Sequence, residues 1–90
     1  MNLESNVLLD FYSEQCHPCK MLTQDLDSIR SQFSNLEIQK LNIMEHYELT
    51  EKYNVRSVPT LVLLKKDKSQ ARYTSYKGKA DLTKFLEENV

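Results

Sequence analysis

Hydrophobic and polar residues follow one another along this chain in short segments whose periods predict four strands. Residues 7–12 form an apolar run interrupted by a single carboxylate, which is typical of a strand buried on both faces. In residues 36–42 apolar and polar side chains alternate, and this period of two also predicts a strand. Residues 61–64 are continuously apolar and follow Pro59, which suits the beginning of a strand. Residues 71–76 carry charges and hydroxyl groups and predict an edge strand.

Apolar residues spaced three and four apart predict the helices. From Pro18 onward such residues draw one stripe that predicts a helix ending near Ser34 and Asn35; they are Leu22, Leu26, Ile29 and Phe33. Residues 45–53 predict a short helix, and a last amphipathic helix follows Gly78 with Leu82, Phe85 and Leu86 on its apolar side. The order β-α-β-α-β-β-α predicts an α/β fold in which one four-stranded mixed sheet is flanked by helices. We expect residues 1–90 to form a single domain.

Composition excludes several classes of function. The formal net charge is −1 and acidic and basic residues are mixed along the chain, so we expect neither nucleic acid nor a membrane surface as a partner. Residues 1–6 lack the charged start and apolar stretch of a signal peptide. Two cysteines are too few for a disulfide-stapled secreted scaffold. We therefore expect a monomer in the cytoplasm. In that reducing compartment a cysteine pair is catalytic or metal-binding rather than structural.

The candidate chemistry lies in Cys16-His17-Pro18-Cys19, where the first helix begins. Cys16 precedes the helix, and the unpaired N–H groups of the helix start favour a thiolate there. Pro18 suits the first helical turn, where its missing N–H costs nothing. Cys19 lies three residues before Leu22, on the buried stripe, and should keep its proton until chemistry removes it. One sulfur can then attack a substrate disulfide while the other resolves the mixed disulfide. The pattern predicts a thiol–disulfide oxidoreductase that needs no cofactor.

A metal site is the alternative use of the same two cysteines. A closed zinc site needs four ligands, and the chain offers Cys16, Cys19, His46 and an awkwardly placed His17. A metal or iron–sulfur cluster shared between two chains would also use this pair. Two further redox alternatives are a disulfide-donating oxidoreductase and a glutaredoxin-like use of glutathione, although no glycine-rich stretch follows the Pro59 strand.

Three polar residues around the cysteines have both a functional and a neutral interpretation. Asp10 interrupts an apolar strand, and burial raises the pKa of a carboxyl, so Asp10 is a candidate base for Cys19. The alternative is that Asp10 is partly hydrated at the strand end and merely tolerated, and we favour the functional interpretation because the apolar run surrounds it. Lys40 is either a partner of Asp10 or a solvated lysine of an edge strand. A protonated His17 would stabilise the nearby thiolate and make the disulfide more oxidising, or it is an indifferent surface residue.

Several motifs occur together in one order: residues 7–12, Cys16-His17-Pro18-Cys19-Lys20, residues 40–43 and Val58-Pro59-Thr60-Leu61. With these motifs the chain, from about Val7 to Leu86, resembles the thioredoxin family. The resemblance implies that Pro59 is cis and packs beside the disulfide, and that Val58 offers backbone hydrogen bonds to the substrate. It also implies that Asp10 is a buried carboxylate under the active site, with Lys40 beside it. The implied partners are disulfide-containing client proteins and a reductase or other dithiol electron donor.

The chain departs from that family at several positions. We expect it to lack the N-terminal strand and helix of typical thioredoxins, which would leave residues 36–42 as an exposed edge strand. Tyr12 and Gln15 stand where the family carries tryptophans, and we count both among the expected substrate-binding residues. His17 replaces the usual glycine of the motif, and Ser75 stands about where a glycine is common. These departures concern substrate recognition and redox potential rather than the class of reaction.

Overall fold

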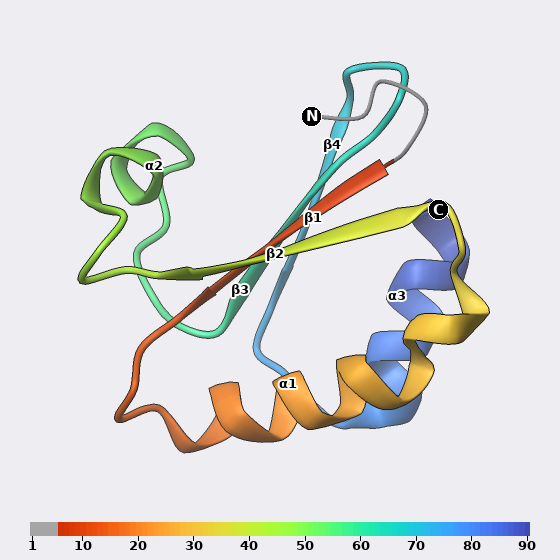
Figure 1. Ribbon diagram of the computed structural model, residues 1–90, viewed down its shortest axis with the longest axis horizontal. Helices are drawn as coiled ribbons and strands as arrows, with labels where there is room; N and C mark the ends of the chain where they lie inside the picture. Colours follow the sequence, from red (N-terminus) through yellow and green to blue (C-terminus); the bar gives the residue numbers. More distant parts are fainter. Residues whose placement is uncertain (1–5) are drawn as a thin grey trace.

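The computed structural model describes residues 6–90, which form one mixed sheet with helices on both faces (Figure 1). Along the chain the elements are β1 (Asn6–Tyr12), α1 (His17–Ile29), the 3-10 turn η1 (Arg30–Gln32), β2 (Leu36–Asn42), α2 (Tyr47–Lys52), β3 (Thr60–Leu64), β4 (Gln70–Thr74) and α3 (Lys79–Asn89). This confirms the predicted β-α-β-α-β-β-α order. The expectation about a missing N-terminal strand and helix falls on residues outside the described range. None of the helices in residues 6–90 combines the length and apolar character that a membrane crossing needs.

The strands lie in the order β2-β1-β3-β4, so β1 is an interior strand and β2 forms one edge of the described sheet. β1 pairs in parallel with β2 and antiparallel with β3, and β3 pairs antiparallel with β4. The register places Asp10 of β1 between Lys40 of β2 and Leu61 of β3. The chain leaves the carboxyl end of β1 directly into α1, and this connection carries the two cysteines.

Two apolar cores lie on the two faces of the sheet, because successive side chains of a strand point to opposite faces. α1 and α3 cover one face and α2 covers the other (Figure 1). The first core gathers residues from all four strands and both long helices: Leu8, Leu22, Leu26, Ile29, Leu36, Leu61, Leu63, Tyr73, Leu82 and Leu86. The second core is smaller and consists of Val7, Leu9, Phe11, Leu41 and Val62. Each fully buried leucine contributes about 1.5–3 kcal/mol of apolar burial, so α1 is held firmly against the sheet.

The first helix follows its predicted stripe, but the expected end near Ser34 is wrong. α1 ends at Ile29, and the backbone tightens into η1 before Phe33. Phe33, which follows η1, nevertheless packs against the first core. The apolar spacing therefore continues past the point where the α-helix stops.

The other boundaries differ from the prediction by a few residues. α2 begins at Tyr47 rather than at residue 45, because the carbonyl of Asn42 accepts the N–H groups of Glu45 and His46 in a turn. β4 ends at Thr74 rather than at residue 76. Its neighbour Ser75 has a φ of 58°, which lies in the left-handed region and takes the chain out of the strand.

Candidate active site

The two cysteines of the motif form a disulfide at the start of α1. Cys16 is the N-cap residue, with extended backbone angles, and its Sγ accepts a hydrogen bond of 3.2 Å from the backbone N–H of Cys19. Cys16 is half-buried, whereas Cys19 is 1% exposed and lies on the apolar side of the helix. His17 and Pro18 between them are exposed. The pair therefore consists of a half-buried sulfur at the start of the helix and a buried sulfur on its inner side.

Asp10 is fully buried on the same face of the sheet as α1. Burial in apolar surroundings raises its pKa from 3.8 to about 6, against the opposing effects of the Lys40 charge and of a hydrogen bond from Thr23. The Thr23 hydroxyl donates to Oδ2 of Asp10 at 3.4 Å. Oδ1 has no hydrogen-bond partner within residues 6–90. A carboxyl with this pKa exchanges its proton readily near neutral pH, which suits a general base.

Lys40 is both a neighbour of Asp10 and an exposed lysine of an edge strand, so it has features of both sequence-based interpretations. It lies directly opposite Asp10 in the β1–β2 register, and its charge lowers the pKa of that carboxyl. Its ammonium nitrogen, however, lies 3.7 Å from Oδ1 of Asp27 on α1, and both side chains are about half exposed, at 43% and 55%. Lys40 is thus a surface lysine that acts on Asp10 through the electric field rather than through a direct ion pair.

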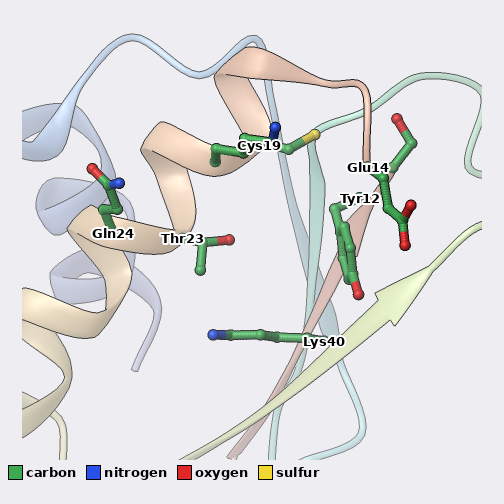
Figure 2. Close-up of a pocket in the computed structure, with 8 residues that line it drawn as sticks. Tyr12, Glu14, Cys19, Thr23, Gln24 and Lys40 are labelled. Carbon is green, nitrogen blue, oxygen red and sulfur yellow. The ribbon is translucent and has the colours of Figure 1, made fainter.

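A hollow of about 670 Å³ lies between α1, the end of β1 and Lys40 of β2. α1 provides Cys19, Thr23, Gln24 and Lys20, and the end of β1 with the segment after it provides Tyr12, Ser13 and Glu14; Lys40 of β2 completes the wall. Figure 2 shows the helix on one side of this hollow and the Lys40 side chain running below it, with Tyr12 at the strand side. The hollow gives solvent a route along α1 to the neighbourhood of Cys19.

The expected substrate-binding residues lie at the same end of the sheet as the disulfide. The Val58–Pro59 peptide bond is cis; Pro59 is buried and Val58 half-buried. Thr60, the next residue, pairs with Phe11 near the end of β1, which places Pro59 beside the segment leading to Cys16. Gln15 is exposed and lines a second hollow with Met44 and its neighbours.

The described residues offer few ligands for the alternative metal site at the two cysteines. Within residues 6–90 no three His, Cys, Asp or Glu side chains lie together in a group that could hold a metal ion. His46 immediately precedes α2 and makes no side-chain cap hydrogen bond, and α2 lies on the face of the sheet opposite to α1. Among the described residues the two cysteines therefore lack the further ligands that a closed zinc site within one chain needs.

Thr23 is the residue of this site that the sequence did not single out. It lies four residues after Cys19, one helical turn further along the inner side of α1. Its side chain is half-buried and lines the hollow. A threonine four residues after a buried cysteine is the only signal in the sequence, because its partner Asp10 belongs to the preceding strand.

The comparisons with known proteins agree with this geometry. The family model described as Thioredoxin matches residues 1–88. A thioredoxin of Chlamydia caviae is 41% identical over 92% of this chain and 81% of its own length, and one of Buchnera aphidicola is 36% identical over 100% and 84%. A solved structure described as a malarial protein shares the fold, with a TM-score of 0.83 at 24% identity, covering 96% of this chain and 98% of its own. The chain thus belongs to the thioredoxin family and is a dithiol thiol–disulfide oxidoreductase whose redox pair is Cys16 and Cys19.

Proposed function

We propose that this protein reduces disulfides in client proteins. The Cys16 thiolate attacks one sulfur of the client disulfide, that S–S bond breaks, and one client thiolate leaves. The Cys19 thiolate then attacks Sγ of Cys16, and the second client thiolate leaves. The client has gained two electrons and the protein holds the Cys16–Cys19 disulfide, which is the form in the structure. A reductase or another dithiol donor must return the two electrons.

Asp10 is the proposed base that takes the proton of Cys19 before the second attack. The observation that carries this proposal is its complete burial together with a pKa raised to about 6. At neutral pH the carboxyl is largely ionised and can accept a proton, yet its pKa is high enough for efficient transfer. An exposed aspartate would be too weak a base to assist a thiol in this way.

The surface around Cys16 is the proposed docking site for clients. Val58 offers backbone groups, Pro59 packs at the end of the sheet, and Tyr12 and Gln15 occupy the positions where the family carries tryptophans. Because both replacements are smaller or more polar than tryptophan, we infer clients with less apolar surface next to their disulfide. His17 and Pro18 are the proposed tuning residues between the two sulfurs.

The proposed function also includes an oligomeric state and a cellular compartment. We infer that residues 1–90 act as a single-domain monomer in the cytoplasm. The two-cysteine content suits a reducing compartment, where a dithiol can be kept in its reduced form.

The reduction potential of the Cys16–Cys19 couple tests this function. Equilibration with glutathione buffers, followed by mass detection of free thiols, should give a potential near the thioredoxin end of the scale, about −270 mV. A value between about −180 and −120 mV would instead identify a disulfide donor or isomerase. Failure to form an intramolecular disulfide would remove the redox function.

The same measurement tests the role of His17. A protonated imidazole stabilises the Cys16 thiolate and thereby the reduced form, so His17→Gly should make the potential more negative by about 10–20 mV. His46→Gln provides the matched control, because this histidine immediately precedes α2 on the other face. Equal potentials for His17→Gly and the wild type would contradict the role of His17.

A further inference from the structure

Among the described residues, Asp10 makes one polar side-chain contact, and this contact leads from the protein interior toward solvent. Among residues 6–90 its only side-chain hydrogen bond comes from the Thr23 hydroxyl, 3.4 Å from Oδ2. Asp10 is completely buried, whereas Thr23 is partly exposed and lines the hollow beside α1. In Figure 2 the oxygen of Thr23 points away from the helix toward the space between α1 and the strands. The hydroxyl therefore touches the buried carboxyl on one side and the solvent-filled hollow on the other.

The other charged groups near Asp10 do not offer such a contact. On β2 the ammonium of Lys40 lies beside Asp27 of α1, and both act on Asp10 through the electric field alone. On β3 the register partner is Leu61, which is apolar. Tyr12, Glu14 and Lys20 line the hollow but make no hydrogen bond to the carboxyl. On β4 the titratable Tyr73 lies in the same core, but its hydroxyl donates to Asp81 of α3. Cys19 also lies on this side, and it is the group whose proton Asp10 is proposed to take.

We infer that Thr23 is the positioning residue that orients the Asp10 carboxyl and connects it to solvent during the resolving step. The inference rests on the proposed role of Asp10 as the base. After Asp10 has taken the proton of Cys19, it is a neutral carboxylic acid and must lose that proton before the next cycle. The carboxylic O–H donates to the Thr23 oxygen while the threonine passes its own hydrogen to a water in the hollow. The carboxylate is restored, one proton has reached solvent, and the threonine is unchanged.

A hydroxyl that donates to a carboxylate stabilises the charged form. Removing it by Thr23→Val, which keeps the shape of the side chain, should therefore raise the pKa of Asp10 by about half a pH unit. Thr23→Ser keeps the hydroxyl and should keep the wild-type value. A 13C NMR titration of the Asp10 carboxyl in the oxidised protein measures this directly.

The kinetic test uses 5,5′-dithiobis(2-nitrobenzoate) as the disulfide and the reduced protein in a stopped-flow instrument. Attack by Cys16 releases the first thionitrobenzoate, and attack by Cys19 on the mixed disulfide releases the second, so two phases separate the two steps. In Thr23→Val the pH midpoint of the second phase should move upward with the pKa of Asp10, and its rate at pH 6 should fall about twofold, because half a pH unit roughly halves the ionised fraction of the carboxyl there. The first phase should not change. Thr83→Val, a hydroxyl removal on the distant helix α3, is the matched control and should leave both phases at their wild-type values.

The outcomes separate this inference from the proposed function. A second phase that responds to Asp10→Asn but has the same pH midpoint in Thr23→Val and in the wild type overturns the role of Thr23 alone. A second phase that Asp10→Asn leaves unchanged overturns Asp10 as the base and the inference with it. A shift in Thr23→Val that Thr23→Ser does not reverse would show a packing effect and would also overturn the inference.

Discussion

Replacing Asp10 by asparagine should make the protein more stable at alkaline pH while leaving its stability at acid pH almost unchanged. The pKa of this carboxyl is raised from 3.8 to about 6 by burial, so the folded state holds the proton more tightly than the unfolded state. A rise of about two units corresponds to about 3 kcal/mol, by which the ionised carboxyl destabilises the fold above pH 6. Below about pH 4 the carboxyl is protonated in both states, and this cost is absent.

The direction of the pH dependence follows from proton binding. Between about pH 4 and pH 6 the folded protein binds a proton at Asp10 that the unfolded chain does not, so the free energy of unfolding falls as the pH rises. Asp10→Asn removes this dependence. Its amide keeps a polar group at a site where Oδ1 has no partner in the described residues, so we expect a gain of about 2 kcal/mol at pH 8 rather than the full 3.

Urea unfolding of the oxidised protein, followed by far-UV circular dichroism because the chain contains no tryptophan, measures the effect. The two proteins should differ at pH 8 and converge near pH 4. Glu88→Gln, which neutralises an exposed carboxylate on α3, is the control and should show no such divergence. A difference between wild type and Asp10→Asn that stays constant from pH 4 to pH 8, or a loss of stability at pH 8, would refute the reasoning.

Three further predictions concern contacts away from the disulfide and can be read from thermal or urea unfolding. Arg72→Ala removes two hydrogen bonds from the guanidinium to carbonyls after α2, including one of 2.6 Å to Tyr53, and should cost about 1–2 kcal/mol, which Arg72→Lys recovers only in part. Tyr73→Phe removes the 2.7 Å hydrogen bond to Asp81 and should cost about 1–2 kcal/mol; an unchanged midpoint would contradict this. Ser75→Gly should stabilise by about 1 kcal/mol, because the φ of 58° strains serine but not glycine; a loss of stability would count against that strain.

The sequence predicted the elements of the fold because their side chains repeat with the period of the local backbone. The apolar run of β1 and the apolar stripe from Leu22 to Ile29 each lie within one element. Their spacing can therefore be recognised from the sequence alone. The end of α1 was mispredicted because Phe33 continues the apolar spacing after the backbone has tightened. β4 ends earlier than predicted because Ser75 adopts a left-handed backbone conformation, and no glycine at that position indicates this in the sequence.

The candidate site was predicted only as far as local motifs reach. The unequal burial of Cys16 and Cys19 follows from their places before and within one helix, and it is confirmed. The Thr23–Asp10 hydrogen bond and the pairing of Lys40 with Asp27 join different elements, so they depend on the packing of α1 against the sheet. The cis geometry of Pro59 was an implication of the family resemblance, since a proline in a sequence does not reveal its isomer.

The interior position of β1 has a consequence for hydrogen exchange. Its backbone is paired with β2 along one side and with β3 along the other, so its amides can exchange with deuterium only when the sheet itself opens. β2 has a free outer side in the described sheet, and α2 buries few residues, so both can exchange through smaller openings. Asp10 lies in the strand that opens last, and its environment therefore survives the partial openings that the rest of the molecule undergoes.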